Sequence, residues 1–426
     1  MTEFDACTSH GVHDARGRKS ERIGAASLLG TAPTLELFEQ AVVDVDCWEQ
    51  PPRAGSRRAG PRCVYSNNGV PGRVWAIMRS IERQRSRGRR AIASVAAALC
   101  ITLLLVNVAA ADVEVHEFPA GTLGTPVGIT AGPLAPPGGT PEQISAQDDL
   151  WFTDFTRDTI SRISPTGSVR LAASLPPGSS PLGITAARDG NLWYTDWTTN
   201  HIGRLTPTGH VDEFPLATPD AHPDGIAAST DGTLWFTEFG SDCVGTITPG
   251  GKITECAAAL AHGSEPDGIT AGRDGDVWFT EAEGDRIGRV APSHELKEFG
   301  LPAGTGPTGI TTGPDGNVWF TERSADRIGR LTPDGHLAQF DLAYTSPQAI
   351  AAGSDGNLWF TETDAVGRVT PSGTVTEFTA GITPSSGPFG MAIGNEDGDP
   401  WFTENLGNHV ARVAWRSLRP TPAPGF

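Results

Sequence analysis

One short phrase recurs seven times in this chain: an aliphatic residue or proline, then tryptophan, an aromatic residue, threonine and an acid. Successive copies are 40–43 residues apart. Their tryptophans are Trp151, Trp193, Trp235, Trp278, Trp319, Trp359 and Trp401. A period near 40 residues with one Trp-centred β-run per copy is typical of a propeller or another stacked array. The repeat therefore predicts the architecture before any single site is considered.

The copy at residues 305–342 indicates how each repeat folds. Four β-runs, at 309–312, 318–321, 328–332 and 336–340, are separated by turn sequences. Asp315-Gly316-Asn317 is a tight-turn signal, because Gly and Asn accept positive φ at low cost. Four antiparallel strands make one propeller blade, and blades stack on one another through their Trp and Phe layers.

Closure of the ring can also be predicted. The seventh copy supplies only three strands, at 391–394, 400–403 and 410–414, while residues 115–118 repeat the pattern of a fourth strand. We therefore predict an all-β, seven-bladed β-propeller of four-stranded antiparallel blades over residues 112–415, closed by an N-terminal strand. A Pro-rich tail follows at 416–426, and a Pro/Gly-rich insertion at 133–147 joins the first two strands of repeat one.

The segment before the repeats has a different character. Residues 78–111 combine an Arg-rich stretch, an apolar run of 18 residues and a closing Ala109-Ala110-Ala111. This order predicts a signal peptide and a secreted or extracytoplasmic protein, in the periplasm or at the cell surface. An uncleaved membrane anchor is the alternative, since 18 residues can just span a bilayer. Residues 1–77 are then a disordered or mis-annotated N-terminal extension, with Met78 as the start.

The charge of the predicted propeller limits the classes of partner that it can bind. Residues 112–426 hold 17 Lys/Arg and 40 Asp/Glu. So acidic a surface argues against nucleic acid and against an anionic membrane surface. We expect a monomer that takes a small-molecule or peptide ligand at the channel mouth. Cys243 and Cys256 flank a Pro-Gly-Gly turn, and their spacing leaves a disulfide and two free thiols equally open.

One position varies among the copies, immediately before each inner strand. It reads Val127, Leu182, Asp224, Asp267, Thr308, Gln348 and Phe389. These residues are predicted to rim one mouth of the central channel. Asp224 and Asp267, with Glu238, Glu265 and Glu281, form a candidate set of oxygen ligands for Mg²⁺ or Ca²⁺. A solvated acidic rim without a metal is the alternative.

A second set of acids follows each Trp-aromatic-Thr phrase. Its members are Asp154, Asp196, Glu238, Glu281, Glu322, Glu362 and Glu404. Because every copy has one, we expect a role in holding each blade rather than in catalysis. The predicted donors are backbone N–H groups or arginines such as Arg204, Arg289 and Arg330.

The repeat unit, with Pro-x-Gly-Ile-Thr, Asp-Gly-Asn-Leu-Trp-Phe-Thr-Glu and Ile-Gly-Arg-Leu-Thr-Pro, resembles that of the virginiamycin B lyase (streptogramin lyase) family over residues 113–415. The resemblance implies a seven-bladed propeller that opens cyclic streptogramin B antibiotics by elimination. It implies a base that removes a proton α to the ester carbonyl and a Mg²⁺ ion that stabilises the enolate.

The resemblance also implies where that chemistry resides, and this chain departs there. The family has a His before the inner strand of blade six, Glu-Pro-His-Gly-Ile in blade seven and an acid after the last Trp strand. Here Gln348, Gly387 and Phe389 replace the two His and the Glu, and only Glu404 remains near the last acid. Neither Gln nor Phe can accept a proton at neutral pH. No catalytic residue is therefore assigned.

Two functional classes stay open at this point. The first is a carbon–oxygen lyase with an altered site that acts on a cyclic ester or depsipeptide, with a possible divalent metal. The second is a non-catalytic propeller that binds a ligand or a protein on its channel face. A lactonase-like propeller hydrolase is a third option.

Overall fold

The computed structural model describes residues 113–121, 123–134 and 146–415, together with the backbone of four short strands nearer the N-terminus. Those four strands, β1 (Ser9–His13), β2 (Lys19–Ile23), β3 (Val43–Trp48) and β4 (Arg62–Tyr65), pair in sequence order as one antiparallel sheet. The chain divides into two compact units, Met1–Thr102 and Leu103–Phe426, and each is described by itself.

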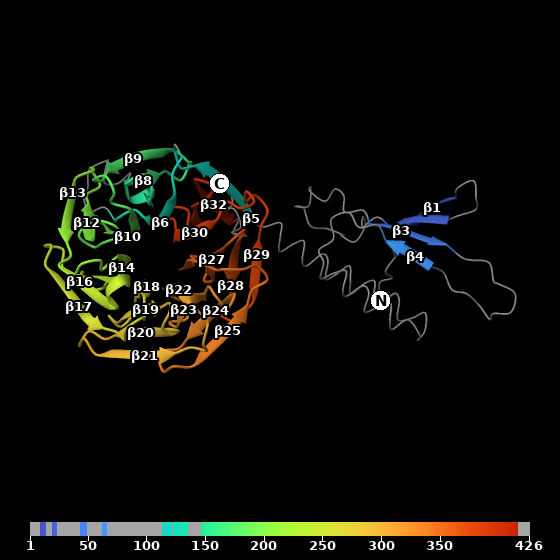
Figure 1. The fold of residues 1–426 in the computed structure, drawn as a ribbon. Coiled ribbons are helices and arrows are strands. Elements are labelled where there is room, and N and C mark those ends of the chain that lie inside the picture. The colour runs from blue at the N-terminus through green and yellow to red at the C-terminus, as the bar shows by residue number, and fades with distance from the viewer. Residues whose placement is uncertain are drawn as a thin grey trace, which may run out of the picture. The chain divides into compact units, whose positions relative to one another are not determined.

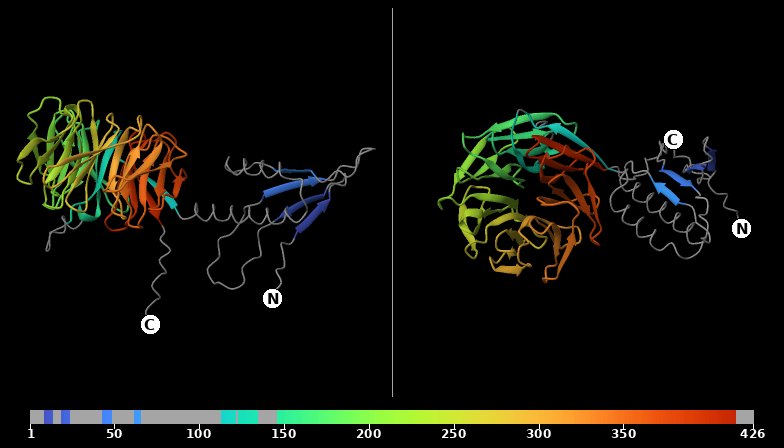
Figure 2. Two further views of the ribbon diagram at one scale, coloured as in Figure 1. Left: turned by 90° about the horizontal axis from the view of Figure 1, so that it is seen from below. Right: turned by 45° about the vertical axis from the view of Figure 1, so that its right-hand side comes forward.

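The second unit is a ring of seven four-stranded antiparallel sheets (Figure 1). In each blade the first strand lines the centre of the ring and the fourth lies at its perimeter, and the ring seen edge-on is a thick disc (Figure 2). The predicted seven-bladed propeller is therefore confirmed. For the repeat at 305–342 the predicted strands agree with the structure to within two residues.

The strands of the seven blades, in blade order, are as follows. Blade 1 contains β6 (Pro126–Ala131), β7 (Leu150–Asp154), β8 (Thr159–Ile163) and β9 (Val169–Ser174). Blade 2 contains β10 (Pro181–Ala186), β11 (Leu192–Asp196), β12 (His201–Leu205) and β13 (Val211–Pro215). Blade 3 contains β14 (Pro223–Ala228), β15 (Leu234–Glu238), β16 (Cys243–Ile247) and β17 (Ile253–Ala259), with the short 3₁₀-helix η1 (Phe239–Ser241). Blade 4 contains β18 (Pro266–Ala271), β19 (Val277–Glu281), β20 (Arg286–Val290) and β21 (Leu296–Gly300).

The remaining blades complete the ring. Blade 5 contains β22 (Pro307–Thr312), β23 (Val318–Glu322), β24 (Arg327–Leu331) and β25 (Leu337–Asp341). Blade 6 contains β26 (Ile350–Ala352), β27 (Leu358–Glu362), β28 (Ala365–Val369) and β29 (Val375–Phe378). Blade 7 contains β30 (Pro388–Ile393), β31 (Pro400–Glu404), β32 (His409–Trp415) and β5 (Val113–Pro119).

The second strand of each blade is buried on both faces, which explains its run of large residues. In blade 5 the ring of Phe320 lies over Gly329 of the third strand, where an added Cβ would come within 2.2 Å of that ring. On the other face Trp319 packs between Arg330, whose guanidinium lies 5.4 Å from its centroid, and Phe340, which stacks at 5.6 Å. In the repeated Ile-Gly-Arg sequence, the Gly therefore leaves room for the aromatic ring on one face of the second strand, and the Arg packs on the Trp on the other face.

The hydrophobic core lies between blades rather than within them. Among the described residues, seven clusters of buried side chains fill the seven interfaces between neighbouring blades. Each cluster combines the Trp face of one blade with the aromatic face of the next, as when Trp319 packs with Leu358 and Phe360. Stacking of such apolar faces is the main favourable contribution to folding.

The N-terminal strand closes the ring as predicted. β5 pairs antiparallel with β32 over seven residues, from Val113 opposite Trp415 to Pro119 opposite His409. Phe118 stacks on Trp401 with the ring centroids 5.8 Å apart, which repeats the Trp–Phe stack of the other blades. The last blade therefore contains both ends of the propeller sequence.

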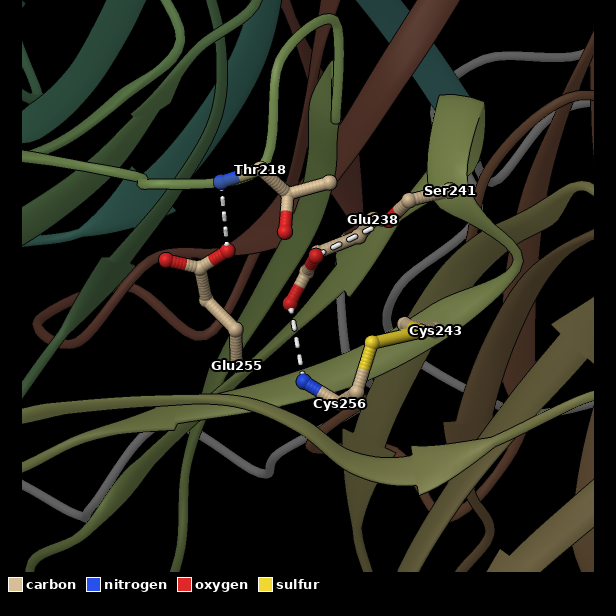
Figure 3. Close-up of a disulfide and its surroundings, with 6 residues drawn as sticks. All are labelled: Thr218, Glu238, Ser241, Cys243, Glu255 and Cys256. Atoms are coloured by element: carbon tan, nitrogen blue, oxygen red, sulfur yellow. Dashed lines mark hydrogen bonds between the residues drawn. A yellow bond between two sulfur atoms is a disulfide. The ribbon is translucent and has the colours of Figure 1, made fainter.

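Blade 3 contains a disulfide between Cys243 and Cys256, so the structure decides between the two alternatives left open above (Figure 3). The register of β16 and β17 shifts between Val244 and Thr246, and Cys256 has a φ of 48°. This bulge brings two cysteines together that regular pairing would keep apart.

Several predictions about the chain ends lie outside the described residues. The signal peptide at 78–111, the tail at 416–426 and most of the extension at 1–77 fall there, and these assignments stay predictions. The insertion in repeat one joins β6 to β7, as expected, although residues 135–145 are likewise outside the described part. In the portion of the chain that is described, no helix is long and apolar enough to cross a membrane.

Deleting residues 112–120 should abolish cooperative folding or lower the melting temperature severely. The deletion removes β5, the partner of β32, and uncovers Trp401. For a large domain each kcal/mol lost shifts the melting temperature by about 2–4 °C, so we expect a fall of more than about 10 °C. Differential scanning calorimetry would measure it, with deletion of residues 417–426 as the control. Equal melting of both truncations would contradict the closure described here.

Candidate functional site

A ring of threonine hydroxyls surrounds one mouth of the central channel. In each blade the Thr of the Trp-aromatic-Thr phrase donates to the backbone carbonyl of the variable residue in the next blade, at 2.5–2.8 Å. The acceptors, in ring order, are Leu182, Asp224, Asp267, Thr308, Gln348, Phe389 and Val127. The seven variable residues are therefore held as consecutive neighbours around the channel, as the sequence predicted.

The two acids of this ring interact with each other. Asp224 and Asp267 lie half-buried on adjacent blades. Burial, with the Asp267 charge beside it, raises the pKa of Asp224 well above its usual range. Burial likewise raises the pKa of Asp267 to about 6, although Arg323 nearby favours its ionised form. Each carboxyl group therefore favours its protonated form more than a free Asp does, and a bound cation would favour the ionised form.

Aromatic side chains pack around His222, which precedes Asp224 on the same segment. His222 lies two residues before Asp224, and its ring stacks on Trp197 with the centroids 4.8 Å apart. Phe239 packs against the same Trp197 ring at 5.3 Å. The Nδ1 of His222 lies 3.1 Å from the carbonyl oxygen of Trp197. Because a carbonyl only accepts, Nδ1 carries the proton and Nε2 is left as the basic nitrogen.

The predicted five-acid metal set is not assembled at the mouth. Glu238 is fully buried inside blade 3, where Ser241 Oγ and the Cys256 N–H donate to it (Figure 3). Glu281 is also fully buried and faces Arg286 at 3.4 Å, and Glu265 lies on a strained turn with φ 49°. Within the described ranges, no three of the five predicted acids bring ligand atoms within 4.8 Å of one another.

The mouth therefore offers two carboxylates to a metal, those of Asp224 and Asp267. Two carboxylates completed by water suit Mg²⁺, whereas Ca²⁺ takes six to eight oxygen ligands. Metal binding at this pair stays a prediction. If Mg²⁺ binds, it supplies positive charge beside a ligand oxygen, and Asp224 and Asp267 are the residues that would hold it.

The acids that follow the Trp-aromatic-Thr phrase serve their own blades. All seven are buried. Asp154, for example, accepts from the Thr125 N–H at 2.9 Å, and Glu322 accepts from Gln339 Nε2 at 2.8 Å. The predicted backbone donors are present, and Glu281 pairs with Arg286, but the three arginines named as examples do not pair with these acids. Arg204 and Arg289 lie on the Trp face and pair with Asp212 and Asp276 respectively, and Arg330 donates to a backbone carbonyl of the next blade.

The positions that carry the chemistry in the resembled family lie together but lack its proton acceptors. The carbonyls of Gln348 and Phe389 accept from consecutive threonines of the ring, so both residues border the mouth. Gly387 has a φ of 68° and accepts the Asn405 N–H at 3.0 Å. Glu404 is fully buried, and burial raises its pKa to about 7. No imidazole occupies these positions.

Sequence reasoning missed part of this face. Trp197, Phe239 and Arg323 each follow the acid at the end of a second strand, a position at which the copies differ. That variation was a usable signal, because the flanking residues of the phrase are nearly constant. The threonine ring was missed for the opposite reason, since a residue present in every copy gives no contrast.

Comparison with known proteins adds to this geometry. The sequence pattern of the virginiamycin B lyase family matches residues 120–278 and 258–417. A solved streptogramin B lyase is 31% identical, with a TM-score of 0.64, and the match covers 71% of this chain and 98% of that one. No curated protein matches the chain.

Two further solved structures come from Staphylococcus aureus. One is virginiamycin B lyase and the other a catalytically inactive variant of it with quinupristin. Both are 32% identical to this chain, with a TM-score of 0.63, and the matches cover 71% of this chain and 99% of theirs. The seven-bladed ring and this shared sequence lead to one conclusion: the chain belongs to the virginiamycin B lyase family.

Proposed function

We propose that this chain is an exported member of the family that binds a small molecule or peptide bearing a cationic group at the channel mouth, without cleaving streptogramin B by the family's route. The single observation behind the proposal is the meeting of Asp224 and Asp267 in the ring of variable residues, with Trp197 and Phe239 packed around His222 two residues before Asp224. Paired carboxylates attract a cation, and aromatic faces add cation–π attraction.

The loss of cleavage rests on the other side of the same mouth. An elimination needs a base within hydrogen-bond reach of the proton that it removes. Gln348 and Phe389 stand where the family has histidines, and neither side chain can take up a proton. Glu404, the remaining acid, is fully buried in its blade and is not presented to the mouth.

A second candidate function is a carbon–oxygen lyase with a relocated base. The observation that favours it is the orientation of His222, whose Nε2 remains basic while Nδ1 donates to Trp197. In this reading His222 Nε2 removes the proton, and the ionised Asp224 and Asp267 orient the substrate or hold Mg²⁺. The electron pair of the broken carbon–hydrogen bond would form a carbon–carbon double bond as the carbon–oxygen bond breaks, and the ester oxygen would leave as a carboxylate.

Cation binding should depend on pH and on the carboxyl pair. Cationic small molecules and peptides, Mg²⁺ and Ca²⁺ would be screened by thermal shift, and each hit titrated by calorimetry between pH 5 and pH 8. Because burial raises the pKa of Asp267 to about 6, affinity should rise as the pH passes that value. The double variant Asp224→Asn/Asp267→Asn should lose at least about tenfold in affinity, the effect of one lost charge-assisted bond. Asp334→Asn, at an exposed turn, is the matched control. Hits that bind the double variant unchanged would refute the site.

Quinupristin should survive incubation with this protein and Mg²⁺. Mass spectrometry would follow the opened product. The variant Gln348→His/Gly387→Glu/Phe389→His restores the family's residues and should gain measurable turnover. Substitution of Gly387 is strained, because its φ is 68° and an added Cβ would meet Asn405 Oδ1 at 2.5 Å and Leu406 Cγ at 3.0 Å, so turnover should be low. Mg²⁺-dependent cleavage by the unmodified chain would instead favour the second candidate, which requires that His222→Asn abolish it.

Export should leave an oxidised propeller without its first 111 residues. The disulfide in blade 3 supports the proposal, since such bonds persist in oxidising compartments. Mass spectrometry of protein from the native host, without reduction, should find an N-terminus near residue 112 and Cys243 linked to Cys256. Peptides from residues 1–77, or free thiols at both cysteines, would count against it.

A further inference from the structure

The seam that closes the ring contains a cluster of metal-ligating side chains away from the channel mouth's variable residues. Glu404 ends β31, His409 begins β32 directly opposite it, and Glu117 comes from the closing strand β5. One oxygen or ring nitrogen from each of these three residues lies within 4.8 Å of the others. The cluster thus draws on both ends of the propeller sequence.

Glu404 points an unsatisfied oxygen into this cluster. Its side chain is fully buried, and Ser386 Oγ donates to Oε1 at 2.8 Å. Oε2 accepts no hydrogen bond of good geometry; it faces Nδ1 of His409 at 3.3 Å, which is an ion pair only when the imidazole is protonated, and the carboxyl group of Glu117 lies beside it. A buried carboxylate oxygen without a partner is costly, so a missing ligand is a physical explanation for the arrangement.

In other blades the corresponding acids Asp196, Glu281 and Glu362 also have an oxygen without a hydrogen-bond partner, but their neighbours differ from those of Glu404. In blade 5 Gln339 occupies the place of Glu117, and its Nε2 lies 2.8 Å from both oxygens of Glu322. In blade 6 Glu377 faces Glu362, but Ala365 stands where blade 7 has His409. In blade 2 His201 has the right register, yet its Nδ1 lies 3.2 Å from Thr199 Oγ1.

Blade 2 has Asp196, His201 and Glu213 at the same register positions. Among the described residues, however, only blade 7 brings ligand atoms of two carboxylates and an imidazole within 4.8 Å of one another. We propose that Glu117, Glu404 and His409 bind a divalent transition-metal ion, with Zn²⁺ the best match, across the seam that closes the propeller. Zn²⁺ takes imidazole nitrogen and carboxylate oxygen, with water as a fourth ligand. His409 keeps 27% of its side chain exposed, which leaves room for that water.

Neighbouring groups already orient the two carboxylates. Ser386 Oγ donates to Glu404, and the Thr383 N–H and hydroxyl both donate to Glu117. Such outer partners fix the ligands of metal sites and raise their affinity. A metal here would connect β5 to β31 and β32, so its binding energy would add to the stability of the closed ring. This inference does not depend on the ligand proposed for the channel mouth.

Zn²⁺ added to the full chain after EDTA treatment and dialysis should raise its melting temperature and bind with one-to-one stoichiometry by calorimetry. The variants Glu117→Gln and His409→Asn should each weaken Zn²⁺ binding at least about tenfold, the lower range for disturbing a metal shell. Glu117→Gln reproduces the Gln–Glu pair of blade 5, so its melting temperature without metal should equal or exceed that of the unmodified chain. Glu377→Gln, which changes an acid pair without a His, should leave Zn²⁺ binding intact.

The absence of a Zn²⁺-dependent shift in the melting temperature of the unmodified chain would overturn the proposal. So would a shift that survives in both Glu117→Gln and His409→Asn, since the metal would then bind elsewhere. Co²⁺ substitution gives an independent readout, because a visible absorption band should appear in the unmodified chain and be lost in His409→Asn. Mg²⁺ should not reproduce the shift, because it binds nitrogen ligands poorly.

Discussion

The hydroxyl group of a repeated threonine is the interaction on which the rest of this propeller depends. In blade 3, Thr237 accepts the Gly225 N–H of its own blade and donates to the Asp267 carbonyl of the next, at 2.8 and 2.7 Å. The same link runs from blade 7 to blade 1 through Thr403 and Val127. Because each hydroxyl holds the backbone of a variable residue, the mouth can change its side chains while the ring stays constant. The aromatic layers supply most of the burial, and the threonines fix how one blade meets another.

Because the threonines hold the backbone of the variable residues and not their side chains, a member of the virginiamycin B lyase family can keep its fold and lose the family's proton acceptors. Gln348 and Phe389 hold the ring through backbone groups, so their side chains can differ. On the opposite side of the mouth Asp224 and Asp267 place two interacting carboxyl groups, where we propose that positive charge binds. Their raised pKa values reflect burial that the backbone ring imposes on them. We infer that recognition has moved around the channel while the blades have stayed the same.

Much of the fold could be predicted from the sequence because the repeat occurs seven times and its copies can be compared. The number of blades, their strands and the closing role of β5 all follow from comparing copies, and the variable ring follows from where the copies differ. The disulfide could not be decided, because the bulge that brings Cys256 to Cys243 leaves no mark in the spacing. The alternation of side chains along a strand explains why the named arginines do not pair with the acids that follow the Trp-aromatic-Thr phrase. Arg204 lies opposite Trp193, whereas Asp196, three residues further on, faces the other side of the sheet. The five acids predicted to bind a metal are not brought together for a similar reason, because Glu238 and Glu281 point into their blades.

The most direct test of this account is the unfolding free energy of Thr237→Val compared with Thr237→Ser, measured by chemical denaturation. Valine matches the shape of threonine but leaves the Gly225 N–H and the Asp267 carbonyl without a partner beside a fully buried side chain. At about 1–3 kcal/mol for each buried group left unsatisfied, the Val variant should lose at least about 2 kcal/mol, and the Ser variant should keep most of the stability. A Val variant as stable as the unmodified chain, or a Ser variant as unstable as Val, would contradict the central role given to the hydroxyl ring.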